Sequence, residues 1–206
     1  MSLIDLIVAI SVVIILFFML MSWLARPKHV NRHINCVTNL KQINLAFRIW
    51  ESDNNNLYPM GISITNGGAM ELIATGNIID CFRCISNEMS TTKILVCPND
   101  HDRTFAANFD ALNKTHVSYF LNADVTNDSH PERILDGDDN LTIDDVLVKS
   151  GLLELATNAP VGWTKERHDY CGNLGFADGS VAEESATGLR TALYYTALAT
   201  NRLAIP

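Results

Sequence analysis

The feature that most constrains this chain is an apolar run near its amino terminus. Residues 6–25 are apolar except for Ser11 and Ser22. In a helix that rises about 1.5 Å per residue, such a run covers roughly the 30 Å hydrocarbon core of a lipid bilayer. Asp5 stands directly before the run. A charged side chain costs roughly 2.5–3.5 kcal/mol at the centre of a membrane helix, so an acid at this place is expected to serve a specific partner.

Two ordinary explanations of the run fit the neighbouring residues poorly. A secretory signal peptide opens with basic residues and ends at a small-residue cleavage site, whereas this chain has Asp5 and no Lys or Arg before Arg26. A plain single-pass anchor should keep its basic flank in the cytoplasm, and Arg26, Lys28 and Arg32 all follow the run. The placement of these basic residues is explained if a basic leader preceded residue 1 and was removed.

A second apolar pattern begins beyond Pro27 and has the period of an amphipathic helix. Its apolar positions, spaced by three and four residues, are Ile34, Val37, Leu40, Ile43, Phe47 and Trp50. Proline lacks an amide donor and crowds the preceding turn, so Pro27 should bend the helix. The Asn-rich run 52–56 should end it. Residues 2–51 are therefore predicted to form one long bent helix.

The chain is expected to divide into this helix and a head. Residues 1–26 should lie in lipid, residues 27–51 should pack on the head, and residues 52–206 should form one small α+β domain. The net charge of −8 and the pI of about 5.1 exclude an electrostatic nucleic-acid binder. The sequence contains no Gly-rich phosphate loop, nucleophile elbow or His-Glu-x-x-His pattern, so it indicates no enzyme.

The head is predicted to combine short helices with antiparallel strands. Apolar periodicity favours helices at residues 70–75, 78–89 and 186–203. Short apolar runs favour strands at residues 93–97, 117–121, 173–177 and 180–183. The last two flank Asp178-Gly179, a strong hairpin signal because Gly tolerates the positive φ of a tight turn. Residues 122–145, which are rich in Asp and Asn, are predicted to be a long loop that Arg133-Ile-Leu interrupts.

The first residues of the chain read Met1-Ser-Leu-Ile-Asp5-Leu. This pattern resembles the mature amino terminus of type IV pilins and pseudopilins, which begin with a Phe-Thr-Leu-Ile-Glu-Leu type of sequence directly after a Gly that the prepilin peptidase cleaves. Here Met1 stands in place of Phe, Ser2 in place of Thr, and Asp5 in place of Glu. The resemblance implies that residue 1 is a processed and methylated terminus. An initiator Met is the alternative.

Two further stretches carry the same resemblance. The stretch after the apolar run reads Asn35-Cys36-Val-Thr-Asn-Leu-Lys-Gln-Ile and is similar to the corresponding stretch of G-type pseudopilin-like proteins. His168, nine intervening residues and Asp178-Gly179 match the His-x9-Asp-Gly motif of that group's processing-associated domain, as in members common in the verrucomicrobial lineage. The resemblance implies a pilin-like α+β fold, in which a long bent amino-terminal helix packs on a small globular head with an antiparallel sheet.

The resemblance also implies assembly rather than catalysis. The chain would wait in the bacterial inner membrane and then join identical subunits in a helical homopolymer, a type IV pilus-like or type II secretion pseudopilus filament, in the periplasm or outside the cell. Its other partners would be the prepilin peptidase and methyltransferase and the assembly platform, with no nucleic acid. Asp5 would pair with the amino group of residue 1 on a neighbouring subunit. The filament core would contain Leu3, Leu6, Ile10, Val13, Leu16 and Phe17.

A second class of function stays open at this point. The chain can instead be a single-pass, membrane-anchored extracytoplasmic binding protein or adhesin that does not polymerise. In both classes Asp178-Gly179 is expected to form a turn. His168 is expected to be a hydrogen-bonded packing residue, because the sequence pairs it with no evident nucleophile and acid.

The five cysteines predict a disulfide, because an extracytoplasmic head folds in a disulfide-permissive compartment. One bond is expected among Cys81, Cys84, Cys97 and Cys171, with its connectivity open. The same four thiols leave zinc open, although only Cys81-x-x-Cys84 has the spacing of a ligand pair. Cys36, on the flank of the helix stripe, is expected to be a small buried hydrophobe.

An acidic stretch offers oxygen ligands for calcium. Asp136, Asp138, Asn140 and Asp144 are spaced by two and four residues, and Ca²⁺ is bound by carboxylate and amide oxygens. G-type pseudopilins of secretion systems carry a calcium site in the loops of the head, which adds to this hypothesis. The EF-hand pattern itself fails, because Leu141 stands at the position of its Gly. A solvated acidic loop without metal is the alternative.

Overall fold

The computed structural model describes the backbone of residues 3–24 and 28–206 and the side chains of residues 3–21 and 34–206. The chain forms two compact units, Met1–Arg32 and His33–Pro206. Met1 and the bend predicted at Pro27 lie outside the described residues. The chain is an α+β protein with an apolar amino-terminal helix and an antiparallel sheet, as predicted.

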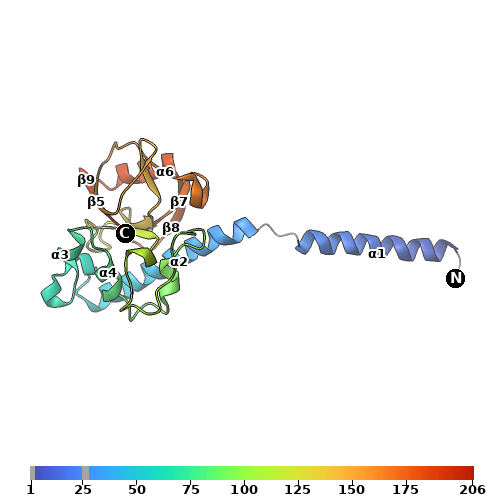
Figure 1. Cartoon of the computed structure of the whole chain (residues 1–206), viewed down its shortest axis with the longest axis horizontal. Helices are drawn as coiled ribbons and strands as arrows, with labels where there is room; N and C mark the ends of the chain where they lie inside the picture. Colours follow the sequence, from blue (N-terminus) through green and yellow to red (C-terminus); the bar gives the residue numbers. More distant parts are fainter. Residues whose placement is uncertain (1–2, 25–27) are drawn as a thin grey trace. The chain divides into compact units, whose positions relative to one another are not determined.

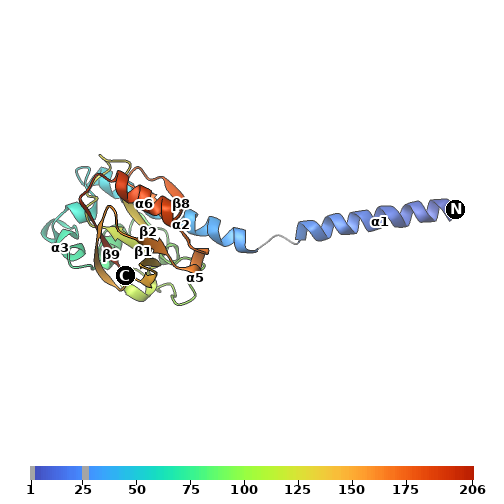
Figure 2. The ribbon, with the colours of Figure 1, turned by 90° about the horizontal axis from the view of Figure 1, so that it is seen from above.

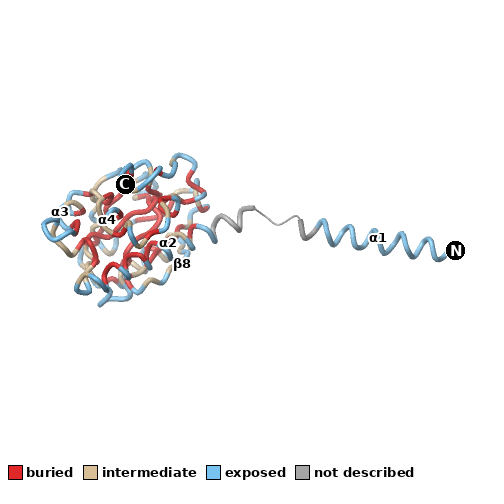
Figure 3. Tube along the Cα trace, turned by 90° about the horizontal axis from the view of Figure 1, so that it is seen from below, coloured by how far each residue is buried: buried red, intermediate tan, exposed pale blue. Residues whose placement is uncertain are grey.

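α1 (Leu3–Leu24) is the helix that the apolar run predicts (Figure 1). The stretch Leu3–Met21 is exposed throughout (Figure 3), and it is long and apolar enough to cross a membrane. Ser11 donates its hydroxyl hydrogen to the carbonyl of Val8 at 2.8 Å, so the helix itself satisfies this polar group, as a lipid environment requires. Asp5 lies in the first turn, where the helix dipole favours an acid.

α2 (Lys28–Asp53) packs one face against the head from Cys36 onward. The predicted apolar stripe is confirmed over most of its length, and its buried members are Leu40, Ile43, Phe47 and Trp50. Ile34 differs, because it is 56% exposed and precedes the part of the helix that the head covers. Beyond the helix, Asn55 and Asn56 adopt positive φ and turn the chain, which Asn tolerates better than most residues.

The centre of the head is a six-stranded antiparallel sheet with the strand order β5-β9-β1-β2-β7-β8. Figure 2 labels β9, β1, β2 and β8 of this sheet. Its strands are β1 (Tyr119–Asn122), β2 (Ile134–Asp138), β5 (Gly151–Ala156), β7 (Cys171–Phe176), β8 (Val181–Ser185) and β9 (Thr200–Ile205). A smaller sheet has the order β4-β3-β6. Its strands are β3 (Leu141–Ile143), β4 (Val146–Leu147) and β6 (Val161–Trp163).

Helices cover both faces of the six-stranded sheet. Successive side chains of a strand point to opposite faces, and in β1 the buried residues Tyr119 and Phe120 belong to two different hydrophobic clusters. Phe47 of α2 shares the cluster of Tyr119. Leu189 of α6 (Ala186–Tyr195) shares the cluster of Phe120. α2 and α6 therefore cover opposite faces, and the head has three layers.

Short helical turns complete the head. They are α3 (Met70–Ile73), α4 (Ile79–Cys84), α5 (Lys165–His168), η1 (Pro59–Gly61), η2 (Ile64–Asn66), η3 (Thr92–Leu95) and η4 (Lys114–His116). The helices predicted at residues 70–75 and 78–89 are confirmed in shortened form as α3 and α4. Gly76 separates them with a positive φ of 83°, a conformation that glycine adopts without strain.

The hairpin and the first strand agree with the sequence prediction. β7 and β8 pair in register on either side of Asp178-Gly179, and Gly179 has a φ of 85°. The Gly179 amide donates to the Phe176 carbonyl at 2.9 Å and closes the turn. The strand predicted at residues 117–121 is present as β1.

Two predicted elements are wrong, and a third, a helix, is shorter than predicted. Residues 93–97 are not a strand, because the Thr91 hydroxyl caps η3 by accepting from the Lys93 amide. Residues 122–145 are not a long loop, because β2 pairs between β1 and β7 and brings its acids inside the head. The helix predicted at residues 186–203 ends at Tyr195, where a turn with Ala197 at a φ of 55° sends the chain back as β9.

Candidate functional site

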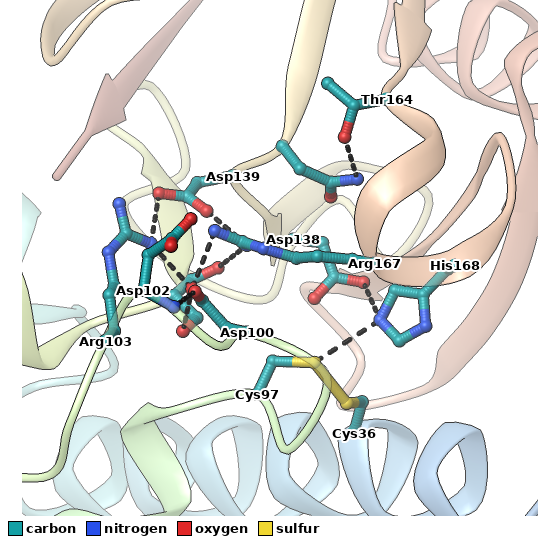
Figure 4. A network of polar contacts seen from close by, with 12 residues as sticks. Cys36, Cys97, Asp100, Asp102, Arg103, Asp138, Asp139, Thr164, Arg167 and His168 are labelled. Atoms are coloured by element: carbon teal, nitrogen blue, oxygen red, sulfur yellow. Dashed lines mark hydrogen bonds and ion pairs between the residues drawn. A yellow bond between two sulfur atoms is a disulfide. The ribbon is translucent and has the colours of Figure 1, made fainter. Parts of the chain in front are cut away.

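A disulfide between Cys36 and Cys97 joins α2 to the segment that follows η3 (Figure 4). Both residues are fully buried, and their Cα atoms are 5.4 Å apart. The expected bond between two of Cys81, Cys84, Cys97 and Cys171 is therefore wrong, because Cys97 alone of the four is bonded and its partner lies outside the set. Cys36, expected to be a packed thiol, is the partner, because α2 crosses the head beside Cys97. Within the described residues Cys81, Cys84 and Cys171 are free thiols, and burial raises the pKa of each.

His168, from the predicted motif, lies at the end of α5 with its ring fully buried beside this disulfide. Its Nε2 is 3.4 Å from Cys97 Sγ and 3.3 Å from Asp138 Oδ2. Its Nδ1 is 3.2 Å from the side-chain nitrogen of Asn99. The prediction of a hydrogen-bonded packing residue agrees with these contacts. His168 thus connects the disulfide to the central strand β2.

Asp138 anchors the same cluster from the sheet. Its Oδ2 accepts hydrogen bonds from the backbone and side-chain nitrogens of Asn173, both at 2.8 Å. We call Asn99, Asp138, His168 and Asn173 the buried polar cluster. All four residues are at least nine-tenths buried. Hydrogen bonds within the cluster offset the cost of burying these polar groups.

Asp136 forms a second polar contact between the sheet and α2. With its amide oriented to donate, the Asn44 side-chain nitrogen lies 2.8 Å from Asp136 Oδ2. Burial, together with the nearby charge of Asp138, raises the pKa of Asp136 well above its usual range. A Cβ at Gly175 of β7 would overlap this carboxyl group, so β7 requires glycine at that position.

Next to the cluster lies an ion network of Asp100, Arg103, Asp139 and Arg167 (Figure 4). Arg103 Nη1 is 2.6 Å from Asp139 Oδ2, and Arg167 Nη2 is 2.7 Å from Asp100 Oδ2. Burial raises the pKa of Asp139, and the two guanidinium groups oppose that rise. The two acids and two bases balance in charge, so the network acts as a neutral buried unit.

The ion network forms part of the wall of a 470 Å³ pocket, to which Asn140 and Thr164 also contribute. A second pocket of 620 Å³ is lined by Trp163 and Tyr170 and shares Thr164 with the first. Among the described residues, the lining of neither pocket joins a nucleophile to a base and an acid. The four charged side chains of the ion network in the first pocket are engaged with one another.

The calcium candidates are not brought together. Asp136 and Asp138 lie in β2 with the partners given above, Asn140 donates to the Thr164 hydroxyl at 3.2 Å, and Asp144 is exposed in the turn after β3. The expectation of a solvated acidic loop is also wrong for the first three, which are buried. Within the described residues, one group offers three metal-binding side chains at ligand distances, and it consists of Cys36, Cys97 and His168.

The other end of the sequence motif also contacts α2. The Arg48 guanidinium donates to the Asp178 carbonyl at 2.8 Å, and the Ser180 amide donates to Asp178 Oδ1 at 2.8 Å. The turn role predicted for Asp178-Gly179 agrees with this geometry. Asp178 thus contacts α2 directly, whereas His168 lies beside the disulfide that joins α2 to Cys97. Cys36, Asn173 and the ion network were not identified as a site from the sequence, and Asp138 was identified only as a candidate calcium ligand, through the Asp-rich composition of residues 136–139.

The residues predicted for a filament core lie on α1. Leu3, Leu6, Ile10, Val13, Leu16 and Phe17 are all exposed. An apolar surface of this kind is unfavourable in water, so these side chains are expected to be covered by lipid or by protein.

The carboxyl end of α2 gives a pH-dependent prediction. Glu51 is 4% exposed, and its Oε1 accepts from the Asp128 amide at 2.9 Å. Burial raises the pKa of Glu51, so its contribution to stability is full below the unfolded pKa and is lost as pH rises through the folded pKa. Glu51→Gln keeps the acceptor without the charge. We expect this variant to gain stability over the wild type as pH rises from 4 to 8, measured by thermal unfolding in detergent micelles.

Glu71 provides the control of opposite sign. The Ser63 hydroxyl donates to Glu71 Oε1 at 2.6 Å and lowers the pKa of this exposed acid. Its contribution is therefore present above the unfolded pKa and is lost as pH falls. Glu71→Gln should lose stability relative to the wild type over the same pH rise. If the stability of both variants relative to the wild type changed in the same direction with pH, the raised pKa of Glu51 would be contradicted.

Comparisons with protein-family models, with curated proteins and with solved structures found no match for this chain. The chain's own structure shows an α+β head, an apolar helix able to cross a membrane, and a disulfide that lies against a buried histidine.

Proposed function

We propose that this chain is a structural subunit of a type IV pilus-like or type II secretion pseudopilus filament and polymerises through α1. The observation that carries the proposal is the exposed apolar surface of α1, which continues from Leu3 to Met21. Asp5 is the one ionisable residue in that helix. Membrane anchoring alone would account for the apolar surface but gives no reason for the acid.

The physical chemistry of assembly assigns different tasks to the two features. Lipid chains are as apolar as the side chains of α1, so moving the helix from lipid into a bundle gains little hydrophobic energy. Close packing and polar contacts then decide whether helices associate and in which register. Asp5 supplies such a contact by pairing with a cation of a neighbouring subunit. A pair of this kind defines register more than it adds stability.

The connection between α2 and the head supports the same function. A filament subunit must keep its head attached to its helix when the filament is under load. Here the disulfide at Cys36, the Asn44–Asp136 contact and the Arg48–Asp178 hydrogen bond hold α2 at three places along its length. α2 therefore cannot peel from the head without breaking a covalent bond.

Asp5→Ala tests the proposal. We expect the variant to insert in the membrane as the wild type does, because the apolar run is unchanged, and to reduce filament yield at least tenfold. The measurement is a quantitative immunoblot that compares the mechanically sheared fraction with the membrane fraction of producing cells. Ser11→Ala is the matched control, since its hydroxyl is satisfied within α1, and it should assemble normally. A normal sheared yield from Asp5→Ala would contradict the proposal.

A second candidate function is a membrane-anchored binding protein that does not polymerise. It is favoured by the two adjoining pockets of 470 and 620 Å³, both of which include Thr164 in their walls. In that case the sheared fraction would contain no assembled chain, and detergent would release monomers from the membrane.

A further inference from the structure

We propose that the Cys36–Cys97 pair has a second state: after reduction, its two thiolates bind one Zn²⁺ together with His168 and Asp138. The Sγ atoms of Cys36 and Cys97 and a ring nitrogen of His168 all lie within 4.8 Å of one another, and all three residues are buried. Two thiolates, an imidazole and a carboxylate are a ligand set that suits zinc. This site is different from the Cys81-x-x-Cys84 pair that the sequence suggests.

The distances around His168 fit a tetrahedral site. Zinc bonds of about 2.0–2.3 Å place neighbouring ligand atoms roughly 3.3–3.8 Å apart. His168 Nε2 is 3.4 Å from Cys97 Sγ and 3.3 Å from Asp138 Oδ2. Reduction frees the two sulfur atoms to separate to a similar distance. Cys97 and Asp138 thus each lie at about this distance from His168 Nε2.

Asp138 has an oxygen to offer. Its Oδ2 is engaged by Asn173 and His168. Its Oδ1 is buried and accepts no hydrogen bond from any described residue. A buried carboxylate oxygen without a donor is costly, and a metal ion would compensate that cost. This unsatisfied oxygen belongs to the carboxyl group whose Oδ2 lies 3.3 Å from His168 Nε2.

Neighbouring side chains can support the metal-bound state. As the Asn99 amide is oriented, its nitrogen faces His168 Nδ1, so Nε2 carries the ring proton and donates. Rotation of that amide by 180° would let Nδ1–H donate to Asn99 Oδ1, which frees Nε2 for zinc. Two thiolates and one carboxylate leave the zinc complex with one negative charge.

The chemistry of the switch balances as follows. A dithiol reductant transfers two electrons and two protons to the Cys36–Cys97 bond and becomes a disulfide itself. Zinc then displaces the two thiol protons to solvent, so its affinity rises with pH. The consequence is that α2 stays tied to the head in both redox conditions, through the disulfide when oxidised and through zinc when reduced.

Metal content of the full-length chain in detergent micelles tests this inference. One sample is kept oxidised; the other is reduced with a dithiol and freed of it by gel filtration under argon, and both receive zinc chloride. Cys81, Cys84 and Cys171 are free thiols in both samples, so the oxidised chain is the matched control for them. We expect one zinc per chain in the reduced sample alone, and a thiolate-to-metal absorption band when cobalt replaces zinc.

Variants identify the ligands. Asp138→Asn and His168→Gln should each weaken zinc binding at least tenfold in the reduced chain, whereas Asp80→Asn, beside Cys81, should leave it unchanged. Equal zinc in the oxidised and reduced samples, or none in the reduced sample, would overturn the proposal, as would unchanged affinity in both ligand variants. The comparison of oxidised and reduced wild type decides the matter even if a ligand variant does not fold. Filament formation has no part in any of these outcomes.

Discussion

Arg167→Gln is expected to lower the free energy of unfolding by about 3–5 kcal/mol, because breaking one member of a buried ion network leaves uncompensated charge. Arg167 is 13% exposed at its side chain and pairs with both Asp100 and Asp139. Without it, Arg103 alone must balance two buried carboxylates. Urea unfolding of the full chain in micelles, followed by tryptophan fluorescence, measures the change, since Trp50 and Trp163 are buried in the head.

Arg202 supplies the matched control for this prediction. It also pairs with an acid, Asp124, but its side chain is 41% exposed. Exposed ion pairs contribute at most about 1 kcal/mol, so Arg202→Gln should cost far less than Arg167→Gln. Equal losses of unfolding free energy in the two variants would contradict the expectation that burial makes the loss of Arg167 costly.

Removal of the disulfide is expected to have an effect of similar size. The chain-entropy model gives about 4 kcal/mol for a link between residues that are 61 positions apart. The double variant Cys36→Ser with Cys97→Ser should lose about this amount of unfolding free energy, measured in the presence of a metal chelator. The double variant avoids leaving one buried thiol without its partner.

Cys84→Ser is the control for the loss of a sulfur atom as such. Cys84 is a free, partly exposed thiol, so its replacement should change stability by less than about 1 kcal/mol. A double variant as stable as the wild type would contradict the structural role of the disulfide. Reduced wild type should regain part of the lost stability when zinc is added, since a ligand of the folded state stabilises it, whereas the double variant should not.

The parts of the fold that the sequence predicts correctly are those decided by neighbouring residues. The apolar run predicts α1 through composition alone, and the stripe from Leu40 to Trp50 predicts the buried face of α2 through its period. Asp178-Gly179 predicts the β7–β8 hairpin because only a few residues tolerate its turn.

The parts that it misses depend on contacts between distant residues. Asp138 lies in a stretch of residues that seldom form strands. Its burial is explained by its hydrogen bond with Asn173, which is 35 positions away. Cys36 finds Cys97 because α2 lies against the head in one register, which no local pattern encodes. The ion network likewise joins Arg167 to Asp139 across 28 positions. Composition shows that residues 136–139 are acidic, but it cannot show that these acids are buried and paired with residues distant in the sequence.

Electron microscopy of material sheared from producing cells tests the central claim most directly. Antibodies against the head, coupled to gold, would mark every place where the chain is present. The account predicts thin filaments labelled along their whole length, and their absence from cells that produce Asp5→Ala. Release of the chain only by detergent, as labelled monomers with no filament in the sheared fraction, would contradict it.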